Sequence, residues 1–272
     1  MEVIDPGATD PAPVLRLLAL AAAVASLLTA LAAARRVRLG VPLVTPRSMS
    51  PAPWSGRDVA VVVGTLLWVQ VLAAAVAPPT APLASRLLVS VVGMVLATGL
   101  AGWYLRVAGA SWHDIGLTGW RWGEGMRTAL AALALVLWPL LALATLLDRV
   151  VPYRHPIIEY LGDHRGGAAM ALVVLSAVVV APVVEEFLFR RVLLGWLLRA
   201  WPVAGGLGAV AVQAMAFGMS HAGQGLAPVP LTLFGLVLGW LALRTGSLLP
   251  GILLHALFNA VSIGLVVWGP SV

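Results

Sequence analysis

The sequence predicts an all-α, polytopic transmembrane helix bundle with about eight transmembrane helices. Two features of the composition support this prediction. The 272 residues are 61% hydrophobic and only 10% charged, whereas a soluble domain has about 25% charged residues. The mean hydropathy is +0.98. A third observation is that the apolar residues gather into runs of about 18 or more, which are long enough to cross a hydrocarbon core. We therefore expect an integral membrane protein.

Eight apolar runs follow one another along the chain, and each predicts a helix. The runs lie near residues 14–34, 59–77, 87–105, 128–147, 167–199, 203–221, 229–244 and 247–268. The first run follows an acidic tail, whereas a cleavable signal begins with a basic segment, so we expect this helix to be retained. A linker rich in Pro and Arg, residues 35–57, separates the first two helices.

The distribution of arginine predicts the orientation. All 17 basic residues are arginines, and the net charge is +6. Most of them cluster between apolar runs without an interleaved aromatic stripe, which argues against a nucleic-acid partner and is typical of topology signals. The arginine-rich segments 35–57 and 106–127 are therefore expected in the cytoplasm. Both termini would then lie outside, and the plasma (inner) membrane is the expected location. The chain has no cysteine, which excludes disulfides and thiolate chemistry.

Two adjacent acidic residues, Glu185 and Glu186, lie inside an apolar run. An ionisable group at that depth costs about 3 kcal/mol on insertion scales, and two like charges also repel. Arg190 follows Glu186 by one helical turn, so we expect these two side chains to pair. Glu185 is then left free for chemistry. A purely structural ion pair between helices is the alternative.

Two histidines, His221 and His255, interrupt or close later apolar runs, and Asn259 follows His255 on the same helical face. Phe217 precedes His221 by one turn and can pack against the same face. With a rise of about 1.5 Å per residue from the cytoplasmic turns, Glu185 lies about 21 Å deep and His221 about 25 Å deep. The same rise places His255 at about 12 Å and Asn259 at about 18 Å. These side chains can therefore meet in one layer.

Such a set of side chains supports hydrolysis. A buried carboxylate is a competent general base towards water, and a neutral imidazole can hold that water or relay its proton. A second imidazole and a carboxamide can donate to a developing oxyanion. No serine lies in a nucleophile-elbow pattern, so a covalent intermediate is not indicated. A zinc ion bound by Glu185, His221 and His255 is the open alternative for activating the water.

Three motifs resemble those of the CPBP family of intramembrane proteases, also called the CAAX-protease or Abi family. They are V-V-E-E-F-L-F-R-R at 183–191, F-G-M-S-H at 217–221 and H-A-L-F-N at 255–259. The resemblance implies about eight helices around a cavity that opens to the cytoplasm. Eukaryotic members remove the last three residues of prenylated CAAX proteins. By this resemblance Glu185 would be the water-activating base, aided by His221.

The same resemblance implies roles for the other polar residues of the motifs. Glu186 and Arg190 would be supporting residues, and His255 and Asn259 would stabilise the oxyanion. The family has been described both as metalloproteases and as metal-independent glutamate proteases, so a divalent metal such as zinc stays an alternative. We expect two parts, 1–109 with three helices and the linker, and 110–268 as the protease-like core.

The predicted function is that of an intramembrane endopeptidase that uses a glutamate-activated water. Its expected partners are membrane lipids and a peptide or a lipidated membrane protein as substrate. A proton-coupled transporter is one alternative, although polar membrane residues are concentrated in the second half of the chain, unlike the paired halves of many transporters. A non-catalytic immunity or scaffold protein of the same fold is another, and it predicts a missing motif residue, yet none is missing.

Overall fold

A computed structural model of the chain describes residues 12–47, 49–116, 121–153, 167–202 and 206–268, and within these ranges all regular structure is helical. The eight expected helices are all present. Their bounds are α1 Ala12–Arg38, α2 Gly56–Val76, α3 Leu83–Val107, α4 Trp122–Asp148, a long helix Gly167–Ala200, α9 Leu207–Met219, α10 Pro228–Thr245 and α11 Leu249–Trp268. The predicted all-α bundle is thus confirmed.

Seven helices of the described ranges are long and apolar enough to cross a membrane. The exception is α9, whose 13 residues extend for only about 20 Å. The expected helix 203–221 extends two residues beyond the C-terminal end of α9, and its first residues, 203–205, lie outside the described residues. Gly223 and Gly225 in the following turn have φ of 97° and 62°, a conformation that glycine adopts without strain and that stops a helix.

The long helix, here called the site helix, alternates between α and π geometry along its length. Its segments are α6 Gly167–Val174, η1 Leu175–Val180, α7 Ala181–Glu185, η2 Glu186–Leu193 and α8 Leu194–Ala200. The sequence analysis expected a plain helix over 167–199. The two π segments lie on either side of Glu185, and π-helical turns are frequent at functional sites.

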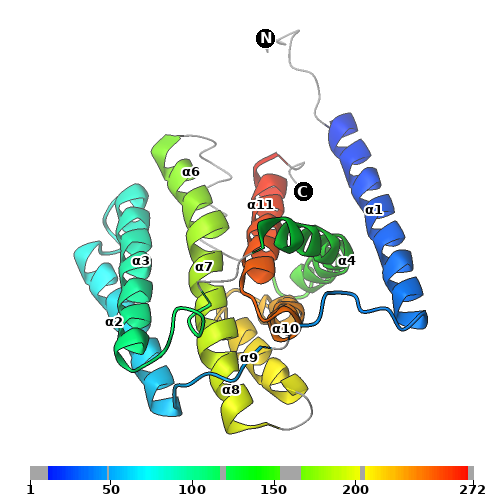
Figure 1. Cartoon of the computed structure of the whole chain (residues 1–272). Coiled ribbons are helices and arrows are strands. Elements are labelled where there is room, and N and C mark those ends of the chain that lie inside the picture. The colour runs from blue at the N-terminus through cyan, green and yellow to red at the C-terminus, as the bar shows by residue number, and fades with distance from the viewer. Residues whose placement is uncertain (1–11, 48, 117–120, 154–166, 203–205, 269–272) are drawn as a thin grey trace, which may run out of the picture.

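The site helix runs through the middle of the bundle (Figure 1). The pair α2–α3 packs on one flank of it, and α11 packs on α4 on the other flank, while α1 stands at the edge beyond α4. One apolar cluster joins α2, α3 and the site helix through residues such as Val62, Leu105 and Phe187. A second cluster joins the site helix to α9, α10 and α11 and includes Phe217 and Phe234. The site helix is therefore held from both sides.

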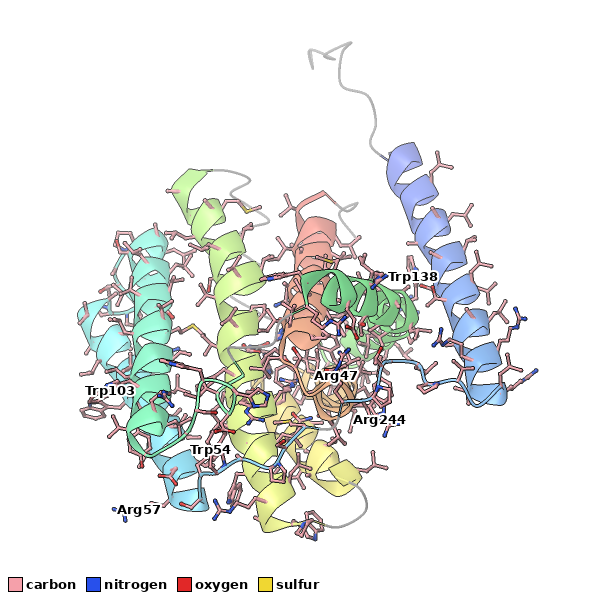
Figure 2. The ribbon with its side chains drawn as sticks, in the orientation of Figure 1. Arg47, Trp54, Arg57, Trp103, Trp138 and Arg244 are labelled. Atoms are coloured by element: carbon pink, nitrogen blue, oxygen red, sulfur yellow. The ribbon has the colours of Figure 1, made fainter. Side chains whose placement is uncertain are left out.

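The linker between α1 and α2 crosses the ends of α10 and the site helix. The backbone N–H groups of Arg47 and Met49 donate to the Arg244 and Leu243 carbonyls at 2.8 and 3.1 Å. Figure 2 shows Arg47 beside Arg244. The linker thus satisfies carbonyls in the last turn of α10 that have no partner within the helix.

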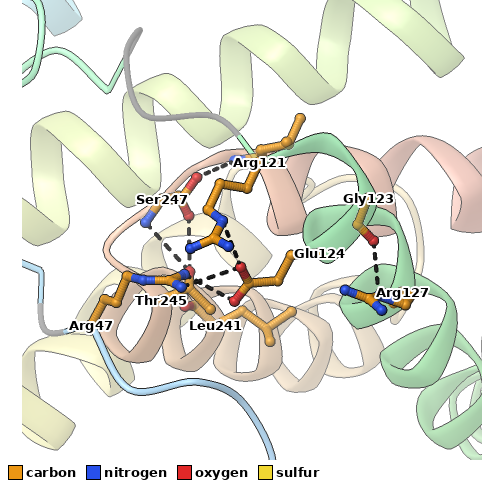
Figure 3. Close-up of polar contacts among 9 residues, drawn as sticks. Arg47, Arg121, Gly123, Glu124, Arg127, Leu241, Thr245 and Ser247 are labelled. Atoms are coloured by element: carbon orange, nitrogen blue, oxygen red, sulfur yellow. Dashed lines mark hydrogen bonds and ion pairs between the residues drawn. The ribbon is translucent and has the colours of Figure 1, made fainter.

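The same linker is tied to the start of α4 by a carboxylate between two arginines (Figure 3). Arg47 donates to both Glu124 oxygens at 2.9 and 3.2 Å, and Arg121 Nε lies 3.1 Å from Glu124 Oε2. Both guanidinium groups are partly exposed, so each pair contributes little to stability. Glu124 lies in the first turn of α4, where the helix dipole also favours a negative charge.

Trp54 fastens the other end of the linker, and we expect Trp54→Phe to destabilise the fold. Its buried indole N–H donates to the Val192 carbonyl in η2 at 3.0 Å, and loss of that hydrogen bond should cost about 1 kcal/mol. The measurement is thermal unfolding in detergent. Trp103→Phe is the matched control, because Trp103 is 66% exposed on α3. Equal shifts in the two variants would contradict the anchoring role of Trp54.

Candidate active site

A fully buried ion pair lies at the start of η2. Arg190 Nη1 is 3.1 Å from Glu186 Oε1, and the two side chains are 0% and 1% exposed, respectively. The expected pair is therefore present. The guanidinium lies 4.2 Å over the ring of Phe217 on α9, a cation–π contact that gains strength when desolvated. The ion pair lacks hydrogen-bond geometry, so none of the three guanidinium nitrogens has a hydrogen-bond partner among the residues that the structure describes.

His255 of α11 lies between the two glutamates. Its Nδ1 is 3.1 Å from Glu186 Oε1, and its Nε2 is 3.7 Å from Glu185 Oε2. The imidazole is 4% exposed, and the rings of Phe217 and Phe234 meet it edge-on at 5.8 and 5.5 Å. The structure thus brings both carboxylates to one imidazole, held at a fixed angle by two aromatic rings.

Glu185 differs from its neighbour in exposure and in partners. Its side chain is 22% exposed, against 1% for Glu186. Glu185 Oε2 has no hydrogen-bond partner among the described residues, because the distance to His255 is too long for a hydrogen bond. The same lack of a partner holds for Glu186 Oε2, and both of these oxygens are buried. Only the Glu185 side chain as a whole is partly exposed, so Glu185 is the one of the two carboxylates that solvent can approach.

His221 is linked to His255 by the ring of Phe217, which contacts both histidines. It lies in the turn after α9, and its Nδ1 is 3.1 Å from the Phe217 carbonyl and 3.2 Å from Ser220 Oγ. Its ring packs edge-on against Phe217 at 5.3 Å, and Phe217 in turn contacts His255. Within the described part of the chain, no hydrogen bond joins His221 to either glutamate.

Asn259 contacts the backbone of the site helix. Its Nδ2 donates to the Ala177 carbonyl in η1 at 2.8 Å. The resemblance implied an oxyanion donor at this position, whereas here the amide already has a protein acceptor. Together His255 and Asn259 attach α11 to the site helix at two heights, one turn apart.

The sequence analysis missed Gly251 and Phe234 as parts of this site. A Cβ at Gly251 would lie 2.7 Å from Glu186 Oε2, so a side chain there would displace the carboxylate. Gly251 precedes His255 by four residues, and that spacing places both on one helical face. The spacing could have revealed Gly251, whereas the contact of Phe234 depends on how α10 packs against α11.

The possible zinc shell of Glu185, His221 and His255 does not form in this structure. No three His, Asp or Glu side chains of the described residues are grouped so that they could hold a metal ion. The contacts explain this result, since His255 turns one nitrogen to each glutamate and the Nδ1 of His221 faces the Phe217 carbonyl. The residues present do not fit a three-ligand zinc site.

Two cavities adjoin the site helix, and Leu248 lines both. The first, of about 300 Å³, is almost wholly apolar and lies between α3, the site helix and α11. Val183 and Phe187 line it, two residues before and two after Glu185. The second, of about 260 Å³, is lined by both polar and apolar side chains and is bordered by Arg191 and by the linker. Neither cavity is lined by Glu185 itself.

An aspartate orients Arg191, which borders the second cavity. Arg191 donates to the Asp114 backbone carbonyl, and its guanidinium lies 3.9 Å from the Asp114 carboxylate. Partial burial raises the pKa of Asp114. The hydrogen bonds from Ser111 and the charge of Arg191 together lower the pKa by more than burial raises it, so the net shift is downward. Asp114 is therefore ionised at neutral pH.

A comparison with known protein families finds a match over the residues that carry the site. Residues 167–261 match the family model described as type II CAAX prenyl endopeptidase Rce1-like. These residues form an Rce1-like domain. The Rce1-like domain begins with the site helix and ends two residues after Asn259, so it holds all the predicted site residues. No curated protein and no solved structure matches the chain. The predicted boundary between residues 109 and 110 stays a prediction.

The ion pair of the Rce1-like domain can be tested by a double-mutant cycle. Arg190→Met leaves a buried carboxylate without its main counter-charge and should cost about 3–5 kcal/mol of unfolding free energy. Glu186→Gln combined with Arg190→Met removes both charges and should cost clearly less than Arg190→Met alone. The measurement is unfolding in detergent. Additive losses would show that the two side chains do not interact.

Proposed function

We propose that this protein is an intramembrane endopeptidase that hydrolyses a peptide bond with a water activated by Glu185. The observation that carries the proposal is the difference between the two adjacent carboxylates. Glu186 is buried and paired with Arg190, whereas the side chain of Glu185 is partly exposed and lies 3.7 Å from His255 Nε2, which is too far for a hydrogen bond. The match to a prenyl endopeptidase family supports a protease, and the membrane-spanning helices support a substrate that is reached within the bilayer.

Charge balance supports a proton that moves between Glu185 and His255. The group contains two carboxylates, the Arg190 guanidinium and one imidazole, and all but Glu185 are buried. Two negative charges and one positive charge leave the group with a net charge of −1 unless one further proton is bound, and an uncompensated buried charge is costly. His255 Nε2 and Glu185 Oε2, 3.7 Å apart, are close enough to share that proton through a small movement.

The reaction then follows general acid–base chemistry. Glu185 accepts a proton from the water as the water oxygen bonds to the carbonyl carbon of the substrate. As the C–N bond breaks, the same proton passes to the leaving nitrogen. The Nε2 of His221 makes no hydrogen bond within the described residues and is free to hold the water or the oxyanion.

The apolar cavity is the proposed position for the substrate segment next to the cut bond. It lies within one helical turn of Glu185 and takes an apolar side chain or lipid group. The substrate class is a peptide or a lipidated membrane protein. Membrane lipids are the surrounding partners.

We propose that the arginine-rich end of the bundle faces the cytoplasm. The end of α1, the start of α2 and the end of α3 all lie at this end (Figure 1). The N- and C-terminal tails, on whose sides the orientation prediction also depends, lie outside the described residues. The plasma (inner) membrane is the proposed location, with the site open to the cytoplasm.

The proposed function is tested by peptide cleavage with Glu185→Gln. Purified protein in lipid nanodiscs is incubated with farnesylated and unmodified CAAX-type peptides in water enriched in ¹⁸O, and products are read by mass spectrometry. We expect ¹⁸O in the new carboxylate, and a loss of about 10³-fold in kcat/KM for Glu185→Gln. Asp58→Asn, an equivalent change far along the chain on α2, should leave the rate close to that of the wild type. No cleavage by the wild type, or full activity in Glu185→Gln, would overturn the proposal.

Metal dependence is tested separately by chelation. Because Glu185, His221 and His255 do not come together as ligands, no step of the proposed reaction passes through a metal ion. We expect cleavage to persist after dialysis against 1,10-phenanthroline, with no zinc found by elemental analysis of the active protein. Activity that disappears on chelation and returns with zinc would instead support the zinc-bound water of the alternative mechanism.

A further inference from the structure

The π-helical segment η1 leaves one backbone carbonyl without a helical donor. The N–H of Ala181 bonds to the Ser176 carbonyl, five residues back. In the same register the donor for the Ala177 carbonyl would be residue 182, which is a proline and has no N–H. A buried carbonyl without a partner is costly in an apolar bundle, where no water can replace the lost donor.

Asn259 supplies the missing donor. Its Nδ2 lies 2.8 Å from the Ala177 carbonyl, and the bond joins α11 to the site helix. His255, one turn earlier on α11, contacts both glutamates. The position of the Ala177 carbonyl relative to α11 therefore helps to determine where Glu185 lies relative to His255.

We infer that Asn259 is a positioning residue, which holds the π-helical turn created around Pro182 and thereby places Glu185 beside His255. This inference rests on the proposed function for its catalytic consequence. It differs from the oxyanion role implied by the family resemblance, in which the amide acts on the substrate. The two roles predict different responses to a change at Pro182.

The test is a double-mutant cycle between Asn259→Ala and Pro182→Ala. In the wild-type background, Asn259→Ala should lower kcat about 10²-fold with little change in KM, because misplacement of a reacting group by about 1 Å has that effect. Pro182→Ala restores a backbone N–H that can bond to the Ala177 or Val178 carbonyl. In that background Asn259→Ala should cost only about tenfold, a coupling of about 1.4 kcal/mol.

The same cycle is read in the unfolding midpoint in detergent, where the two changes should again be less than additive. Ser262→Ala is the matched control, since the hydrogen bond that the Ser262 hydroxyl makes among the described residues lies within α11, to the Phe258 carbonyl. Its effect should add to that of Pro182→Ala. Equal losses from Asn259→Ala in both backgrounds would overturn the inference and favour a direct role on the oxyanion.

Hydrogen–deuterium exchange gives a second measurement that needs neither the proline variant nor activity. Asn259→Ala should speed amide exchange in peptides covering 175–186 relative to the wild type and to Ser262→Ala. Unchanged exchange there would contradict the inference. If the wild type cleaves no peptide, the proposed function fails, while the exchange and unfolding results still decide the role of Asn259.

Discussion

The burial of two adjacent carboxylates is the constraint on which the rest of this structure depends. An isolated ionised group in a medium of low dielectric is several kcal/mol less stable than in water. The bundle compensates with one guanidinium and one imidazole from different elements, Arg190 on the site helix and His255 on α11. Phe217 and Phe234 enclose these groups and fix their orientation. The cost of burial is therefore offset for Glu186, whereas the Glu185 side chain stays partly exposed.

The geometry of the site helix serves the same constraint. A regular α-helix repeats every 3.6 residues, so adjacent glutamates point in directions about 100° apart. Here π-helical segments precede and follow Glu185, and both glutamates reach one imidazole. The π register has a cost at Pro182, where a carbonyl loses its donor, and the Asn259 amide offsets it. Helix irregularity and polar contacts between helices are thus linked in this site.

The N-terminal part of the chain contributes to the stability of the Rce1-like domain, although it lies outside the matched residues. The linker bonds to the last turn of α10, and Trp54 bonds to the Val192 carbonyl of η2. The cluster of α2, α3 and Phe187 covers one side of the site helix. These contacts show how a segment without a recognised motif can hold the element that carries the site residues.

The sequence by itself determined the membrane class, the eight helices and the pairing of Glu186 with Arg190. These features depend on hydrophobicity summed over long runs and on the spacing of residues within one helix, both of which are local. Depth along each helix also indicated that Glu185, His221, His255 and Asn259 could meet. Only the tertiary structure decided which atoms meet, because contacts between helices depend on how each helix is rotated about its axis. The sequence of a helix whose surface is apolar on all sides does not determine that rotation. The structure shows that His255 lies between the two glutamates, that His221 contacts the ring of Phe217 rather than a glutamate, and that Asn259 donates to a backbone carbonyl.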